Sequence, residues 1–234
     1  MYGGSSMQDA VLDRARALFF NATFVQAYGM SELSPTATML LMADHEDPVL
    51  RLSAGRAAPH VQVRVVDADD TELPRGTVGE IIVRGSSTMI GYWKRPEQTA
   101  EALRGGWMHT GDGGYMNDEG YVFVVDRIKD MIISGGENVY SAEVENVLAR
   151  HPSVAVCAVI ALPDEKWGER VHAVLVLRPG ATVTLEEIQA HARKDIAGYK
   201  VPRSMTIVDS MPLSPVGKIL KRELRKQLSP VTVG

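Results

Sequence analysis

A loop lysine near the carboxyl end of this chain is well suited to act on an anionic centre. Lys218 closes the stretch 212–218 (PLSPVGK) and stands just before a basic amphipathic segment. A lysine is a compact positive charge on a flexible stem, so from a loop it can reach a reacting anion. The alternative for a single Gly-Lys pair is a solvated side chain at the start of a helix.

Four other motifs lie upstream of this loop. They are 2–5 (YGGS), 28–32 (YGMSE), 110–112 (TGD) and 126–138 (DRIKDMIISGGEN). In this order the five motifs resemble the acyl-adenylate-forming (AMP-binding) enzymes, which include acyl-CoA synthetases, firefly luciferase and the adenylation domains of peptide synthetases. The longest motif and 162–168 (LPDEKWG) resemble the fatty-acid branch of acyl-CoA synthetases. Aryl-CoA ligases such as feruloyl-CoA synthetases share much of this pattern and are the alternative.

The resemblance implies a two-step reaction with ATP, Mg²⁺, CoA and a carboxylic acid, expected to be a medium- or long-chain fatty acid. The carboxylate attacks the α-phosphate of ATP to form acyl-AMP and pyrophosphate, and the thiol of CoA then displaces AMP. The first step joins two anions, so it needs cations where charge builds up and reactants held in line. By resemblance, Lys218 bridges the acyl carboxylate and the α-phosphate during this step.

The resemblance also assigns residues to the nucleotide. Gly3, Gly4 and Ser5 resemble the glycine segment that lines the nucleotide pocket. Asp112 resembles the carboxylate that accepts hydrogen bonds from both ribose hydroxyls, which its two oxygens allow; a turn aspartate between glycines is the alternative. Arg127 is expected to contact ribose or phosphate, or else to pair with a surface carboxylate.

The segment Tyr28, Gly29, Met30, Ser31, Glu32 resembles the family's adenine- and magnesium-contacting turn. Glu32 is the expected magnesium ligand, because a hard cation takes carboxylate oxygen and keeps several waters. Ser31 is expected to donate its hydroxyl to a phosphate oxygen. Tyr28 either offers its ring to adenine or is a buried core tyrosine.

The motif 126–138 resembles the family's hinge and thiol channel. Lys129 matches the hinge, and Gly135 with Gly136 borders the channel for the pantetheine arm of CoA. A glycine lets the backbone approach a ligand that a Cβ would block, although ordinary turn glycines are the alternative. Gly113 departs from the pattern, because relatives commonly carry an apolar residue after Thr-Gly-Asp.

The chain contains no counterpart of the family's phosphate loop ending in Pro-Lys-Gly, which lies upstream of the glycine segment in relatives. The sequence therefore resembles a fragment that begins inside the large domain, and alone it is expected to be inactive in adenylation. The alternative is a different class of function, in which the chain is an isolated, non-catalytic nucleotide-binding module.

Composition argues for a cytoplasmic protein without nucleic-acid partners. The net charge of −4 offers no field that would attract nucleic acid or an anionic membrane, and the longest apolar run is 154–162. The start of the chain lacks the features of a secretory signal. Cys157 is the only cysteine, so there is no disulfide framework; it is expected to be a small buried hydrophobe. The six histidines show no metal-ligand spacing.

The elements that carry the first motifs follow from hydrophobic periodicity. A helix is expected within 7–20, and a buried strand at 24–27 delivers 28–32 as a loop. Short strands at 61–66, 80–84 and 121–125, punctuated by glycines, predict a β-rich subdomain over about 52–128. By the resemblance, residues 1–128 are expected to be the end of a large α/β AMP-binding domain, with the boundary at Lys129.

Residues 129–234 are expected to form a small, mobile α+β domain. Ser141 is predicted to cap a helix, and Thr184 with Glu187 forms a capping box for another, which Gly198 ends. Strands are expected at 153–161, 171–177 and 204–208. A last helix begins near Lys218, and its basic residues are expected to be solvated opposite an apolar face; they are Lys221, Arg222, Arg225 and Lys226.

Overall fold

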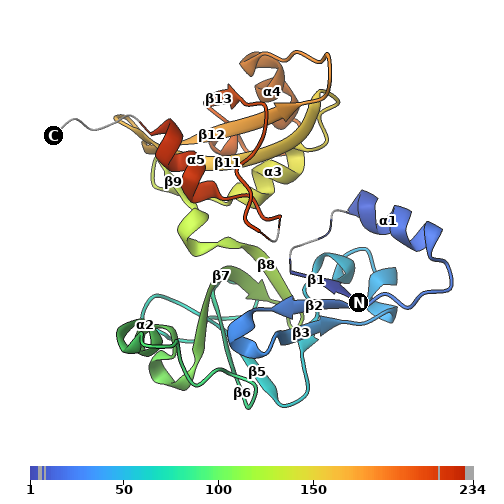
Figure 1. Ribbon diagram of the computed structural model, residues 1–234, viewed down its shortest axis with the longest axis vertical. Helices are drawn as coiled ribbons and strands as arrows, with labels where there is room; N and C mark the ends of the chain where they lie inside the picture. The colour runs from blue at the N-terminus through green and yellow to red at the C-terminus, as the bar shows by residue number, and fades with distance from the viewer. Residues whose placement is uncertain (5–6, 8, 216, 230–234) are drawn as a thin grey trace. The chain divides into compact units, whose positions relative to one another are not determined.

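The computed structural model describes residues 1–4, 7, 9–215 and 217–229. The chain divides into two compact units, Met1–Ile128 (the first unit) and Lys129–Gly234 (the second unit) (Figure 1). Both combine helices with sheets, so the fold is mixed α/β. The helices are α1 (Asp9–Leu18), α2 (Pro96–Ala102), α3 (Ser141–Leu148), α4 (Leu185–Ala192) and α5 (Lys221–Leu228). None of the helices in the described part of the chain is long and apolar enough to cross a membrane.

The first unit holds two four-stranded sheets. One has the order β1-β2-β3-β4, with β1 parallel to β2 and the other neighbours antiparallel. The other has the order β5-β6-β7-β8 and is antiparallel throughout. The strands are β1 (Tyr2–Gly3), β2 (Gln26–Gly29), β3 (Thr36–Leu40), β4 (Arg56–Ala57), β5 (Val61–Val66), β6 (Gly79–Gly85), β7 (Met108–Met116) and β8 (Val122–Arg127). The predicted strands at 61–66, 80–84 and 121–125 are confirmed as β5, β6 and β8.

Strand β6 carries a continuous apolar run because side chains cover both of its faces. Ile81 and Val83 pack in one buried cluster with Leu33. Ile82 lies in another cluster with Trp107. Leu33 belongs to the 3₁₀ turn Ser31–Leu33, so the core anchors the segment that follows Tyr28 to the sheet.

Two expectations about the first unit are wrong. Tyr28 and Gly29 lie inside strand β2 rather than in a loop, because they pair with Thr38 and Thr36 of β3. The glycines of 110–114, expected to separate strands, instead lie in the middle of β7, which hydrogen-bonds to β6 on one side and β8 on the other. Pairing from both sides overrides the low strand propensity of glycine, which is why the sequence alone missed this strand.

The second unit is built on one five-stranded sheet. Its path runs β10-β9-β12-β11, and β13 pairs in parallel with β12. The strands are β9 (Ile132–Ser134), β10 (Glu137–Val139), β11 (Val154–Asp164), β12 (Gly168–Leu177) and β13 (Ser204–Ile207). The three strands predicted in this region are confirmed as β11, β12 and β13.

Helices cover both faces of this sheet, and α3, α4 and α5 surround the long strands β11 and β12 in Figure 1. On one face Val159 packs with Ile188 of α4, and on the other Ile160 packs with Leu224 of α5. Successive side chains of β11 thus point to opposite faces of the sheet, as the two-residue period of a strand requires. Cys157 packs against the first of these cores, and burial raises the pKa of its thiol to about 12. It therefore stays a protonated thiol near neutral pH, as its buried setting predicts.

Helix ends are partly as predicted. Thr184 and Glu187 form the expected capping box at the start of α4. Ser141 is not a cap; it is the first residue of α3, fully buried, and its hydroxyl accepts a hydrogen bond from Lys221 Nζ at 2.5 Å. Gly198 does not end α4, which stops at Ala192, but begins a 3₁₀ turn.

The basic residues of α5 are only partly solvated, which corrects the expectation. Lys221 forms an ion pair with Glu145 of α3 at 2.7 Å, and its side chain is 15% exposed. Arg225 forms an ion pair with Asp130 at 2.9 Å. Arg222 and Lys226 are exposed as expected. The helix is thus bound to its own unit by charge as well as by Leu224.

Candidate functional site

Three of the predicted nucleotide residues come together in the first unit. Asp112 on β7 pairs directly with Arg127 on β8, and its Oδ1 lies 2.7 Å from Arg127 Nε. Its Oδ2 accepts a hydrogen bond of 2.7 Å from the hydroxyl of Tyr28 on β2. The Asp112 side chain is 14% exposed and that of Arg127 is 43% exposed, so the carboxylate lies at the edge of the core beneath a partly exposed cation.

Tyr28 has a strongly perturbed environment. Its ring packs against the core around Leu33, as in the alternative of a buried tyrosine. Burial and then the neighbouring Asp112 carboxylate raise the pKa of its phenol far above the usual value. The phenol therefore stays protonated at all physiological pH values, and it acts as a fixed hydrogen-bond donor to Asp112.

The segment after Tyr28 presents Ser31 and Glu32 at the surface. Met30 packs against the same core, Ser31 is exposed, and Glu32 is partly exposed. Glu32 Oε1 accepts a hydrogen bond of 2.8 Å from the hydroxyl of Tyr92, and burial together with this bond raises the pKa of Tyr92. Sequence reasoning missed Tyr92, because only the fold brings it to a glutamate 60 positions away.

A single carboxylate can serve as a magnesium ligand when phosphate oxygens and waters complete the coordination shell. Across the described residues there is no group of three or more His, Cys, Asp or Glu side chains that could hold a metal ion. Glu32 Oε2 has no hydrogen-bond partner in the described part of the chain. The donor set thus fits a cation that is held mainly by a bound nucleotide and water.

The glycines of the first two motifs have packing roles in the strands. Gly3 pairs with Ala27, and a Cβ at Gly3 would lie 2.2 Å from the carbonyl oxygen of Ala27. A Cβ at Gly29 would lie 1.9 Å from the carbonyl oxygen of Pro35. Gly4 faces open space. Ser5, the remaining residue assigned to this pocket, lies outside the described residues.

In the second unit a hydrogen-bonded loop presents Lys218. The backbone of Ser214 donates to the carbonyl of Lys218 at 2.8 Å, and the amide of Lys218 donates to Ser214 Oγ at 3.0 Å. Leu213 and Ile219 form a β-bridge that closes the loop. The Lys218 side chain is exposed, and its ammonium has no polar partner within the described part of the unit. The loop therefore holds the backbone and leaves the cation free to move.

Gly135 and Gly136 form the turn between β9 and β10, and both have positive φ. Gly135 donates to the carbonyl of Trp167 at 2.8 Å, and a Cβ at Gly135 would lie 2.7 Å from the Trp167 ring. No atom lies within 4 Å of a Cβ built on Gly136, so this side of the turn is open. Lys129 is exposed within the 3₁₀ turn Ile128–Asp130, where the two units join in sequence.

Comparison with protein families matches both units. The model "AMP-binding enzyme" matches residues 1–93, and "AMP-binding enzyme C-terminal domain" matches residues 143–218. Together they correspond to the carboxyl-terminal portion of these enzymes.

The chain is also similar to individual curated proteins. It is 44% identical to a fatty acid–[acyl-carrier-protein] ligase, ScoC, of Streptomyces coeruleorubidus, over 96% of the chain and 43% of that protein. It is 46% identical to a feruloyl-CoA synthase of an Amycolatopsis species, over 91% of the chain and 43% of that protein. The chain thus spans about two fifths of the length of these relatives.

Among solved structures, ATP-bound MatB from Rhodopseudomonas palustris superposes with a TM-score of 0.83 at 33% identity. The superposition covers 94% of this chain and 44% of MatB.

Proposed function

Because the chain belongs to the AMP-binding enzyme superfamily, we propose that it is the carboxyl-terminal portion of an ATP-dependent acid–thiol ligase. Such a ligase activates a carboxylic acid as acyl-AMP and transfers the acyl group to a thiol. The observation that carries this proposal is the Asp112 carboxylate, held between Tyr28 and Arg127 at the edge of the first unit.

Asp112 is proposed to bind the two ribose hydroxyls of ATP. A carboxylate offers about four lone-pair sites, so it can accept from Tyr28, from Arg127 and from a diol. The proton fixed on Tyr28 keeps Asp112 oriented, and the exposed Arg127 can swing toward ribose or phosphate. Gly3, Gly4 and Ser5 are proposed to line the same nucleotide pocket.

The segment from Tyr28 to Glu32 is proposed to contact adenine and phosphate. Gly29 and Met30 would present backbone to adenine, and Ser31 would donate to a phosphate oxygen. Glu32, with Tyr92 orienting its Oε1, would hold Mg²⁺ together with waters and phosphate. When bound, the cation neutralises charge on the phosphates.

Lys218 is proposed to bridge the acyl carboxylate and the α-phosphate while the two anions join. Its free ammonium supports this role, because a mobile cation can follow charge that develops in the transition state. After adenylation, the open side of Gly136, with Gly135 beside it, is proposed to border the channel for the thiol arm. Lys129 is proposed as the hinge that lets the second unit present first Lys218 and then Gly136.

The acid is proposed to be a medium- or long-chain fatty acid, and the thiol that of CoA. Two findings favour other substrates, one for the acid and one for the thiol. The feruloyl-CoA synthase similarity favours an aryl acid. The similarity to a fatty acid–[acyl-carrier-protein] ligase favours a carrier-protein thiol in place of CoA. A non-catalytic nucleotide-binding module remains the alternative of a different class.

The test is an assay of the full-length gene product that contains this sequence. ATP, Mg²⁺ and a panel of fatty and aryl acids are supplied with CoA or with a phosphopantetheinylated carrier protein. We expect AMP and pyrophosphate to appear only with accepted acids, and thioester only with the accepted thiol. Formation of neither AMP nor pyrophosphate with any acid, by a protein that still binds AMP, would favour the binding module.

A further inference from the structure

The strand that carries Asp112 is irregular at this site. Glu80 of β6 pairs with Gly113 and Ile82 pairs with His109, so Ile81 alone opposes the three residues 110–112. Gly111, in the middle of these three, has a φ of 68°, which favours glycine. Extra residues in a bulge are left out of the backbone ladder, so their amides need other acceptors.

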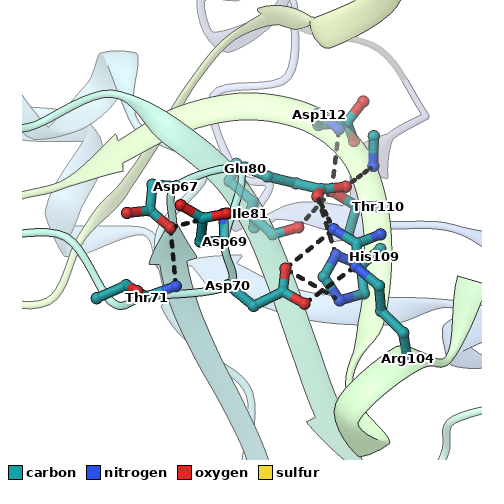
Figure 2. Close-up of polar contacts among 11 residues, drawn as sticks. Asp67, Asp69, Asp70, Thr71, Glu80, Ile81, Arg104, His109, Thr110 and Asp112 are labelled. Atoms are coloured by element: carbon teal, nitrogen blue, oxygen red, sulfur yellow. Dashed lines mark hydrogen bonds and ion pairs between the residues drawn. The ribbon is translucent and has the colours of Figure 1, made fainter.

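A glutamate side chain accepts from the bulged backbone. Glu80 Oε1 accepts a hydrogen bond of 3.0 Å from the amide of Gly111. The Glu80 side chain is 13% exposed, so this bond is largely shielded from water. Beside it, the hydroxyl of Thr110 donates to the carbonyl of Ile81 at 2.6 Å and accepts from the amide of Asp112 at 3.1 Å (Figure 2). The amide of Gly111 is therefore held by Glu80 of β6. The amide of Asp112 is held by the Thr110 hydroxyl, which is itself bound to β6.

The Glu80 carboxylate is itself oriented by two donors. His109 Nδ1 donates to Glu80 Oε2 at 2.9 Å, and Arg104 Nη2 lies 3.2 Å from the same oxygen. Arg104 is fixed in turn by two hydrogen bonds to Asp70, each of 3.0 Å. Figure 2 shows these side chains converging on Glu80 from the side away from Asp112. The network leaves Oε1 pointing at Gly111.

We propose that Glu80 is a positioning residue for Asp112. It replaces the ladder acceptor that the bulge removes, and so it holds the backbone of Gly111 in the conformation that aims the Asp112 carboxylate. This inference rests on the proposed function, in which Asp112 binds the ribose diol. The alternative is an ion-pair network that stabilises the sheet and leaves ligand binding untouched.

The test compares two probes on the 234-residue chain, AMP and 2′,3′-dideoxy-AMP, by isothermal titration calorimetry. The ratio of the dissociation constant of dideoxy-AMP to that of AMP isolates the contribution of the ribose diol. We expect Glu80→Ala to lower this ratio about 5- to 10-fold, the size of one ordinary hydrogen bond. The affinity for dideoxy-AMP should change less than about 2-fold, because that probe lacks the diol.

Two variants give the comparison its controls. Glu80→Gln keeps an oxygen that can accept from Gly111 and should retain most of the ratio, although it loses the charge. Glu72→Ala removes an exposed ion pair of the same unit, that with Arg64 of β5 at 3.2 Å, and should leave the ratio unchanged.

Should Glu80→Ala fail to fold, Glu80→Asp keeps the charge but shortens the reach to Gly111. It should lower the ratio about 3-fold. Equal weakening of the binding of both probes, or an unchanged ratio in Glu80→Ala or Glu80→Asp, would overturn this inference but not the proposed role of Asp112. A wild-type chain that does not prefer AMP over dideoxy-AMP would overturn the proposed role of Asp112, and this inference with it.

Discussion

At the scale of single residues, charge is arranged differently in the two units. Asp112 is enclosed by a phenol and a guanidinium, whereas Lys218 stands in solvent on a closed loop. A binding carboxylate benefits from a fixed orientation, since its task is to meet two hydroxyls in one geometry. A cation that follows developing charge benefits from freedom of its stem. The contrast supports the roles proposed for Asp112 in nucleotide binding and for Lys218 in adenylation.

Lys218→Ala should separate the two half-reactions in the full-length protein. Acyl-AMP formation should fall roughly 30- to 1,000-fold, because a lost charge contact to the reacting phosphate costs about 2–4 kcal/mol. Thioester formation from supplied acyl-AMP should be spared. Single-turnover assays of each step measure this, and equal damage to both steps would indicate misfolding or a shared binding role instead.

Gly111→Ala should weaken AMP binding through the backbone rather than through a clash. A Cβ there would find no atom closer than 4.0 Å, but alanine resists the φ of 68° and costs roughly 1–2 kcal/mol. Gly120→Ala is the matched control, since its φ is 84° with open space around it in the following turn. Both variants should lose similar stability in urea, and only Gly111→Ala should lose AMP affinity. Equal AMP affinities would contradict a specific role for this backbone.

At the scale of elements, ion pairs attach α5 to helix α3 and to the turn Ile128–Asp130. Lys221 contacts both Glu145 and the buried hydroxyl of Ser141 on α3. Arg225 contacts Asp130, next to the start of the unit. Because α5 directly follows the Lys218 loop, these contacts fix the base from which that lysine extends.

Lys221→Ala should destabilise the second unit by about 1–3 kcal/mol, because it leaves a largely buried carboxylate without its cation. Arg222→Ala, one position later on the exposed side of α5, should change stability by less than about 0.5 kcal/mol. Urea unfolding measures both, with the fluorescence of Trp167, the one tryptophan among residues 129–234, reporting on this unit. Equal losses would show that the ion pair with Glu145 contributes nothing specific.

His172 should make the second unit sensitive to acid. It is buried on β12, its ring nitrogens contact the hydroxyls of Ser204 and Thr206, and burial lowers its pKa to about 4. An unfolded histidine titrates near 6.5, so between these values the unfolded chain binds more protons. The contribution of His172 to the free energy of unfolding should therefore be fully present above about pH 6.5. It should fall as the pH is lowered toward 4.

Urea unfolding at several pH values measures this slope, and His172→Gln should flatten it. The loss is bounded by about 3.5 kcal/mol, since each unit of pKa difference corresponds to about 1.4 kcal/mol. Identical slopes for the two proteins would assign the acid sensitivity to other groups.

At the scale of the whole molecule, the chain is two compact units joined at an exposed turn. Each unit has its own sheets and its own core, so either can keep its internal structure while φ and ψ change at the junction. Lys218 and Gly136 belong to the same unit. A rotation at the junction would let that unit offer each of them in turn to one acyl carbon.

Lys129→Pro should restrict this rotation, since proline fixes φ near −65°. In the full-length protein we expect acyl-AMP to form but to pass poorly to the thiol. Lys129→Ala is the control and should leave both half-reactions near wild type, because it removes the side chain and keeps the backbone free. Wild-type rates for both steps in Lys129→Pro would show that the hinge lies elsewhere.

By itself the sequence determined the features that depend on neighbours along the chain. The family motifs, the capping box of Thr184 and Glu187, the alternating strand β5 and the apolar strand β11 could all be predicted, because their signals lie within a few residues. Membership of the superfamily followed from the same local motifs.

Tertiary structure alone decided the contacts between distant segments. Strand β7 exists because β6 and β8 pair with a glycine-rich stretch that has little strand propensity of its own. The bond from Tyr28 to Asp112 spans 84 positions, and that from Lys221 to Ser141 spans 80. Glu80 showed no sign in the sequence, since its partner Gly111 is 31 positions away. Such pairings depend on sheet register and packing, which no local pattern of residues encodes.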